Sequence, residues 1–203
     1  MPAEMPALTT WVALTAGPLL AITCTSFTKI SIVLSALRAG LSEWLIPWSA
    51  VFALSLALTA VVMSPIAAES LAALERVGGV DGLTRGPGSA VLLVLEPLQG
   101  FLQRHADAGE IEFFAGLQGA GAEHPLTLVP AFLITELGEA LQISLLVLVP
   151  FVLVDLIVAQ VLVLMGLTNV QSQPLVSLPL KISLFLAIGG WQVIVRGLLE
   201  GYA

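Results

Sequence analysis

Residues 130–166 read PAFLITELGEALQISLLVLVPFVLVDLIVAQVLVLMG, and this stretch decides what kind of protein the chain forms. Asp155 is the only charged residue between positions 140 and 180. The stretch is long enough to cross a bilayer, which takes roughly 20 apolar residues. A carboxylate at the centre of such a helix costs roughly 2.5–3.5 kcal/mol, so it normally faces protein or water. We therefore expect Asp155 to point toward protein.

Small and polar residues recur along one side of the helix that this stretch predicts. Ser144, Asp155 and Gly166 follow one another at a spacing close to three helical turns, and Ala159 lies one turn from Asp155. Small residues let neighbouring helices approach closely in apolar surroundings. We interpret this side as an assembly face.

The composition places the chain among membrane-associated α-helical proteins. Of its 203 residues, 58% are hydrophobic and 10% are charged, and the mean hydropathy is +1.02. The net charge of −7, from 14 acidic and 7 basic residues, provides no basic patch for a nucleic acid. Cys24 is the single cysteine, so it forms no intrachain disulfide, and we expect it to pack as a small hydrophobic residue.

The apolar runs predict an all-α fold of two long, kinked hydrophobic hairpins separated by a solvated helical insert. Residues 1–74 form the N-terminal hairpin, whose first run (5–37) has a kink at Pro18. Its second run (44–68) begins with Trp44 and Trp48, a position typical of aromatic residues at a membrane interface. Residues 130–203 form the C-terminal hairpin from the runs 141–167 and 175–199.

Residues 75–129 form the solvated insert, because acids, bases and glycines are concentrated there. The most apolar stretch of the insert, 90–102, is too short to cross a bilayer. We therefore expect amphipathic helices that are interrupted at Pro97. The glycines at 78–88 carry neither a P-loop nor a dinucleotide-binding pattern, and we interpret them as a linker.

Three charged residues interrupt the apolar runs. Lys29 lies one turn from Thr25 and Ser26, Lys181 lies in the last run, and Asp155 completes the set. One interpretation is a hydrated channel wall or an ion pair between subunits. The other is a pair of snorkelling lysines or an ion pair that only fixes packing. The sequence does not decide which lysine pairs with Asp155.

The remaining titratable residues do not form a recognisable catalytic, cofactor or metal site. Glu136 and Glu139 share a helix face, but no His or Cys accompanies them, and we interpret them as acids favoured near a helix start or as a subunit contact. The following group fits no standard metal-ligand spacing: His105, Asp107, Glu110 and Glu112. We expect the protein not to be an enzyme, and to need no metal or cofactor.

Four blocks of sequence resemble one protein family in the right order. They are TSFTKISIVLSALRAGL (25–41), PAFLITELGEALQIS (130–144), PFVLVDLIVAQVLVLMG (150–166) and SLPLKISLFLAIGGW (177–191). These blocks are similar to those of the FliP/SctR proteins, the R-type export-gate subunits of flagellar and virulence type III secretion. Members often begin with a signal sequence in the flagellar branch, and none is recognisable here, which favours the virulence branch.

The resemblance implies a core subunit of an export gate in the bacterial inner membrane. It implies a homo-pentamer that joins small S-type and T-type subunits, contacts a U-type switch protein and conducts unfolded substrates. It also implies that the kinked hairpins wrap around a central axis and lie largely above the bilayer plane, whereas hydropathy alone predicts four crossings. Lysine and arginine residues in the loops are too few to orient the chain.

The link after residue 164 departs from the family pattern, in which a methionine-rich loop closes the pore. Only Met165 remains, followed by Gly166, Leu167 and, three positions on, Val170. We expect Met165, Leu167 and Val170 of several copies to form a hydrophobic constriction that excludes ions by dewetting, with Gly166 supplying the bend. The alternative function, from a different class, is a secondary transporter or membrane-enzyme subunit that uses the buried charges as an ion relay.

Overall fold

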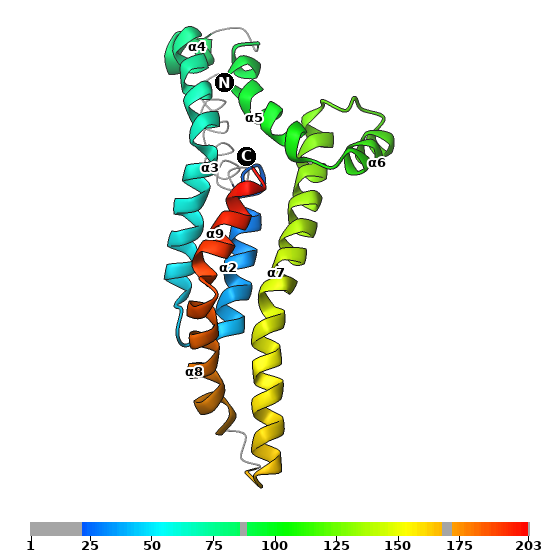
Figure 1. Ribbon diagram of the computed structural model, residues 1–203. Coiled ribbons are helices and arrows are strands. Elements are labelled where there is room, and N and C mark those ends of the chain that lie inside the picture. The colour runs from blue at the N-terminus through cyan, green and yellow to red at the C-terminus, as the bar shows by residue number, and fades with distance from the viewer. Residues whose placement is uncertain (1–21, 86–88, 168–171, 203) are drawn as a thin grey trace, which may run out of the picture. The chain divides into compact units, whose positions relative to one another are not determined.

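The computed structural model describes residues 22–85, 89–167 and 172–202, and all regular structure in these residues is helical. The predicted all-α class is therefore confirmed. In chain order the helices are α2 (Phe27–Leu41), α3 (Trp48–Arg76), α4 (Gly79–Arg85), α5 (Ser89–His105), α6 (Ala108–Gln118), α7 (Pro125–Leu164), α8 (Ser172–Ala187) and α9 (Gly190–Glu200) (Figure 1).

The chain divides into two compact units, and the boundary passes through α3 and α7. Unit 1 contains Met1–Thr28 and Thr59–Gly138, and unit 2 contains Lys29–Leu58 and Glu139–Ala203. The insert therefore belongs to unit 1, and Lys29, Asp155 and Lys181 belong to unit 2.

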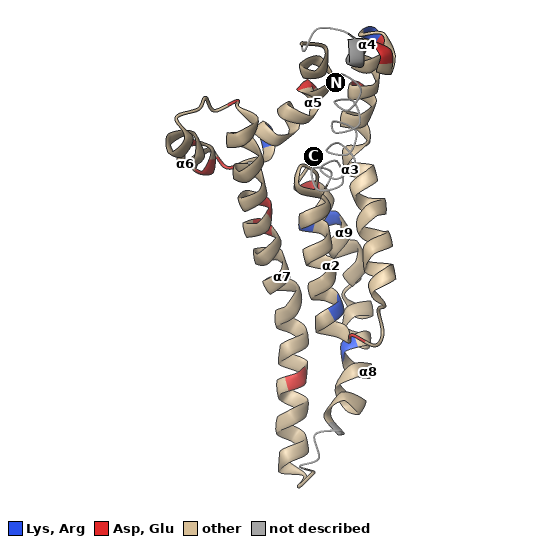
Figure 2. Cartoon of the chain, turned by 180° about the vertical axis from the view of Figure 1, so that it is seen from behind, with Lys and Arg blue, Asp and Glu red and all other residues tan. Residues whose placement is uncertain are grey.

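Unit 2 is built around α2, which lies between the middle of α7 and α9 (Figures 1 and 2). Apolar residues of α2 recur at helical spacing and are almost fully buried: Ile30, Val33, Leu34, Leu37 and Leu41. They pack in one core with Phe151 of α7, Phe185 of α8 and Leu198 of α9. Gly40 allows the closest approach, because a Cβ there would lie 2.5 Å from the Phe151 ring.

Helix α7 is a single helix of 40 residues, and it begins at Pro125 rather than at Pro130 as the sequence suggested. Proline suits the first helical position, where its missing N–H is not needed. Pro130 lies inside the helix and leaves the carbonyl of Leu126 without its usual donor. The side-chain amide of Gln118 donates to this Leu126 oxygen at 2.9 Å, which explains why the helix continues through Pro130.

Unit 1 has its own small core, where α5 of the insert packs against α7. Phe101 of α5 is 1% exposed and its ring lies 5.6 Å from that of Phe132 on α7. The expected interruption at Pro97 is wrong, because α5 runs unbroken from Ser89 to His105. The carbonyl that Pro97 leaves without a donor belongs to Leu93, which is 52% exposed, so water can reach this part of the helix.

Two described helices are long and apolar enough to cross a membrane, α3 and α7. The pair α8 and α9 would make a third crossing if both form one bent span, since they meet at an angle of 59°. The bend is at Gly189, whose φ of 63° is in the left-handed region that glycine tolerates. Hydropathy predicted four crossings, and much of the first predicted run lies outside the described residues.

Candidate functional site

The three charged residues that interrupt the apolar runs take part in two separate ion pairs inside unit 2. The first joins α7 to α8: the Lys181 Nζ lies 2.5 Å from the Asp155 Oδ2, and their side chains are 10% and 34% exposed. The Gln173 side-chain amide adds a second contact by donating to the backbone oxygen of Asp155 at 3.3 Å. The sequence left the partner of Asp155 open, and the structure places Lys181 beside it.

The second pair joins α2 to α7. The Lys29 Nζ lies 2.6 Å from the Glu139 Oε2, and the Lys29 side chain is only 2% exposed. The ring of Tyr202, which follows α9, lies 4.3 Å from the same ammonium group, close enough for a cation–π interaction. Lys29 therefore ties together α2, α7 and the residues that follow α9. It does not join Asp155 and Lys181 in one polar cluster, although the sequence grouped the three residues.

Glu139 was missed as a partner, and its predicted explanation as an acid near a helix start is wrong. Because α7 begins at Pro125, Glu136 and Glu139 lie well beyond the first turn, where the helix dipole no longer acts strongly. Glu136 is 1% exposed. One sequence signal did point to Glu139, since it is the last acid before the uncharged run and an isolated Lys29 needs a carboxylate.

The predicted assembly stripe turns partly toward the chain itself. Ser144 is 6% exposed, and Asp155 faces Lys181 of α8. At these two positions the stripe packs inside unit 2, so the small and polar side chains fit helix packing within one chain.

Helix α7 ends at the predicted constriction in a recognisable glycine cap. Gly166 has a φ of 76°, its N–H donates to Val163 O, and the Leu167 N–H donates to Leu162 O. These two hydrogen bonds together form a Schellman motif, which requires a residue in the left-handed region. Met165 and Leu167 are 68% and 48% exposed. Val170 lies outside the described residues, and the constriction itself stays a prediction.

The residues considered as candidates for catalysis or metal binding make contacts that belong to helix caps and packing. Asp107 caps α6 by accepting from the N–H groups of Gly109 and Glu110. The centre of the His105 ring lies 4.6 Å from that of Phe101, with the two planes tilted by 50°, and Cys24 is 4% exposed. Within residues 22–85, 89–167 and 172–202, no three His, Cys, Asp or Glu side chains gather as they would around a metal ion.

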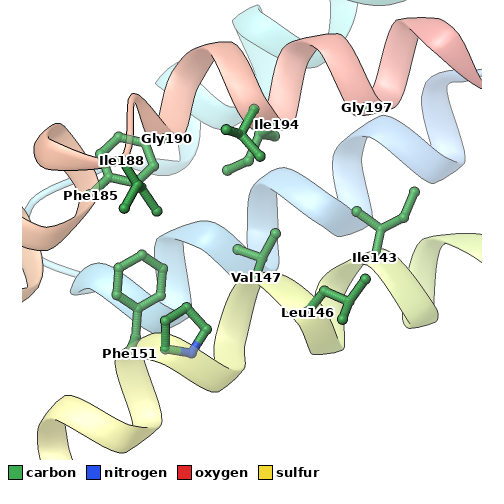
Figure 3. Close-up of a pocket in the computed structure, with 11 residues that line it drawn as sticks. Ile143, Leu146, Val147, Phe151, Phe185, Ile188, Gly190, Ile194 and Gly197 are labelled. Carbon is green, nitrogen blue, oxygen red and sulfur yellow. The ribbon is translucent and has the colours of Figure 1, made fainter.

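An apolar cleft of about 290 Å³ lies between α7 and the bent pair α8–α9. Figure 3 shows Phe151 and Val147 of α7 pointing toward Phe185 and Ile194 on the opposite wall. Every side chain that lines the cleft is apolar, so it offers space for an apolar group and no group for acid–base chemistry.

Comparison with known proteins places the chain in a family. The sequence profile of the FliP family matches residues 10–198. The "Flagellar biosynthetic protein FliP" of Bacillus subtilis is 33% identical over 199 residues, covering 92% of this chain and 85% of the relative. The "Hypersensitivity response secretion protein HrcR" of Ralstonia nicotianae is 31% identical, covering 94% of each chain. The "Yop proteins translocation protein R" of Yersinia pestis is 29% identical, covering 100% and 98%. The resemblance in the four sequence blocks is thereby confirmed, and the chain belongs to the FliP family of type III secretion proteins.

Proposed function

We propose that this chain is a channel-forming subunit of the export gate of a type III protein secretion apparatus. Membership in the FliP family supports a role as a component of that apparatus. The printed names of two relatives, a hypersensitivity response secretion protein and a Yop translocation protein, describe protein export. The finer statement, that the subunit forms the entry pore for unfolded substrates by oligomeric assembly, is our proposal.

One observation carries the proposal: a single chain leaves its long apolar helices uncovered, while the buried Lys29 and Lys181 each pair with a carboxylate of the same chain. On α7, Leu146 is 75% exposed, Ile157 is 62% exposed and Leu164 is 86% exposed. Exposed apolar area of this extent marks surfaces that bind lipid or other protein chains. The ion pairs Asp155–Lys181 and Lys29–Glu139 leave these outer faces uncharged.

The occupants we propose for these faces are other subunits and lipid in the bacterial inner membrane. Copies of the same chain would form a pentamer, and the S-type and T-type subunits would cover further apolar faces. The U-type switch protein would bind the completed gate. Met165 and Leu167, exposed beyond the end of α7, would line the constriction together with Val170.

The proposed subunit works by assembly and gating rather than by catalysis. The His105 ring packs at a tilt against Phe101, and the His124 Nδ1 accepts from the Leu126 N–H at 3.3 Å, so both have packing or turn contacts. Alanine variants at Cys24, His105 and His124 should therefore keep export. Loss of export in one of them, with assembly intact, would indicate chemistry instead.

The experiment that tests the proposal is co-purification of the tagged chain with small hydrophobic partners, followed by native mass measurement. We expect a complex with several copies of this chain and a loss of stable protein when the partners are absent. A monomer or dimer that transports ions along a gradient would contradict the proposal and favour the transporter alternative. Export of a reporter substrate from cells that carry the assembled complex tests the channel role separately.

A further inference from the structure

Helices α8 and α9 form one segment that is bent by 59° at Gly189. The backbone of Gly189 is left-handed, with a φ of 63° and a ψ of 43°. Glycine populates this region about as readily as the right-handed helical region. Gly189 itself therefore adopts a bent or a straight helix at similar cost, and the contacts on both sides of the bend decide which form is populated.

The bend leaves backbone groups at the start of α9 without intrahelical partners. Gly189 is the N-cap of α9 and makes no side-chain hydrogen bond to the first N–H groups of the helix. In a continuous helix, the N–H groups of residues 190–192 would donate to the carbonyl oxygens of residues 186–188. Hydrogen bonding along the backbone therefore favours a straight helix.

Side-chain packing holds the bend in place. The Phe185 ring lies beside Gly190, where an added Cβ would overlap the ring (Figure 3). The centre of this ring also lies 5.5 Å from that of Trp191, with the two planes at 84°, which is a favourable edge-to-face arrangement. Residues five apart lie on different sides of a continuous helix, so straightening would remove the contact between Phe185 and Gly190.

One face of α8 attaches this helix to the rest of unit 2. Its residues are four apart and therefore lie in one row: Gln173, Ser177, Lys181 and Phe185. Ser177, Lys181 and Phe185 are 3%, 8% and 5% exposed. Lys181 pairs with the Asp155 carboxylate, and the Gln173 side-chain amide donates to the Asp155 backbone oxygen. The polar contacts of this face therefore converge on Asp155 of α7.

The two helices differ in how firmly apolar packing holds them. Ile194 and Leu198 of α9 are buried in the core that α2 forms, whereas among the described side chains of α8 only Phe185 is apolar and buried. The apolar cleft of about 290 Å³ separates α7 from the bend, and beyond the bend α8 runs back toward the end of α7 (Figure 1). A segment with few buried apolar contacts is the one that opens most readily.

We propose that α8 is an arm that swings on Gly189 while α9 stays in the core, and that the Asp155–Lys181 pair is the lock that holds this arm against α7. Residue 175 lies about 21 Å from Gly189 along α8. Removing the whole bend of 59° would move this residue by about 20 Å, and the length of the link 165–171 limits the swing. The proposal does not rest on the chain being an export-gate subunit.

The test measures distances between two nitroxide labels by pulsed electron paramagnetic resonance. The sample is the full chain in a Cys24→Ala background, purified with any partners it requires and with an excess of unlabelled copies, so that each distance lies within one chain. The first pair, Leu175→Cys with Arg196→Cys, joins exposed positions of α8 and α9. The control pair, Leu145→Cys with Arg196→Cys, joins α7 to α9 and excludes the arm.

Two changes are designed to release the arm. Asp155→Leu combined with Lys181→Leu removes the lock without leaving a buried charge. Gly189→Ala disfavours the left-handed backbone. The Cβ added at Gly189 meets the end of the Gln192 side chain, which is flexible and can move, so the backbone angle decides the effect.

We expect the chain without the lock to show a second, longer distance for the pair on α8 and α9. Adding Gly189→Ala should raise the ratio of swung to bent chains by a further factor of about 5–30. The matched control Gly189→Asn should raise this ratio much less, because asparagine tolerates a left-handed backbone. A single, unchanged distance in the chain that combines Asp155→Leu, Lys181→Leu and Gly189→Ala would overturn the proposal. Equal broadening for the control pair would also overturn it, because the whole unit would then loosen.

A second measurement leaves the hinge and the lock intact. Ser177→Cys on α8 and Ser55→Cys on α3 each place a thiol in unit 2 where the native side chain is 3% or 0% exposed. In a Cys24→Ala chain, a swing of α8 would expose the thiol of Ser177→Cys and leave that of Ser55→Cys covered. Maleimide should therefore modify Ser177→Cys faster, with each rate divided by that of the denatured chain. Equal relative rates would show that both thiols become accessible only when the unit unfolds, and this result would overturn the proposal.

Discussion

Replacing Asp155 by leucine tests most directly what the pair between α7 and α8 does. Asp155→Leu keeps the number and branching of the side-chain heavy atoms and removes the carboxylate 2.5 Å from the Lys181 Nζ. The ammonium group of Lys181 then stays in a site where its side chain is 10% exposed. Because a buried charge without its partner is strongly unfavourable, we expect the variant to be less stable and to assemble poorly.

The size of the effect follows from the burial of each partner. Breaking a buried ion pair costs about 3–5 kcal/mol. Since the Asp155 side chain is 34% exposed, we expect a value near the lower end, about 3 kcal/mol, which is roughly a 100-fold change in an equilibrium constant. Lys181→Leu should cost less, because the remaining carboxylate of Asp155 is reached by water. The double variant should be close to wild type, since it leaves no charge behind.

Thermal unfolding of the purified complex in detergent measures the stability, and native mass measurement gives the fraction assembled. The order of stability should be wild type and double variant, then Lys181→Leu, then Asp155→Leu. A matched control combines Asp155→Leu with Lys29→Leu. This second lysine pairs with Glu139, so its removal should not rescue the loss.

Two outcomes would refute the reasoning. If Asp155→Leu unfolds and assembles like wild type, the pair contributes nothing measurable. If Lys29→Leu rescues Asp155→Leu and Lys181→Leu does not, then Lys29 is the partner in the assembled protein, and the pairing within one chain is not the one that matters.

Three further predictions concern other parts of unit 2. Glu139→Gln should lower the unfolding temperature more than Lys29→Met, because only Glu139→Gln leaves the Lys29 ammonium group, whose side chain is 2% exposed, without the Glu139 carboxylate. Equal losses of unfolding temperature in the two variants would contradict this prediction. Gly190→Ala should destabilise the protein by about 1–3 kcal/mol through overpacking, since the added Cβ would lie 2.2 Å from the Phe185 ring. The control Gly197→Ala adds its Cβ to open space, so it should be neutral or stabilising in the same thermal unfolding assay. Deletion of residues 167–170 should leave the complex assembled but make membranes leaky to small ions, and unchanged conductance would place the constriction elsewhere.

The fold class could be predicted from the sequence because the apolar runs are long and their charges few. The bend at Gly166 was also readable, since this glycine adopts the left-handed backbone that ends a helix; the similar bend at Gly189 was not predicted. Helix boundaries at prolines were less predictable. Pro130 and Pro97 both lie inside helices, because a distant Gln118 side chain supplies a donor near one and solvent reaches the other. No local sequence pattern indicates that a side chain or water will replace the hydrogen-bond donor that a proline lacks.

The charged pairs show a second limit of the sequence. Lys29, Asp155 and Lys181 were recognisable as costly residues that need partners, but pairing depends on which helices lie side by side. Glu139 was assigned to a helix start because the true start, five residues earlier than Pro130, was not recognised. One error in a boundary therefore hid the partner of Lys29.

The two ion pairs change what the polar residues can contribute to an assembly. An ion pair between subunits would leave Asp155 and the lysines unpaired in a single chain, whereas both lysines here have a carboxylate from their own chain. Breaking these pairs to form new ones between subunits would offer little gain, because the same kinds of charge are exchanged. Association must then draw on the exposed apolar faces, such as that of Leu146 and Ile157 on α7. The pairs fix the positions of α2, α7 and α8 within the subunit, and this fixed arrangement determines which apolar faces its neighbours and the lipid can reach.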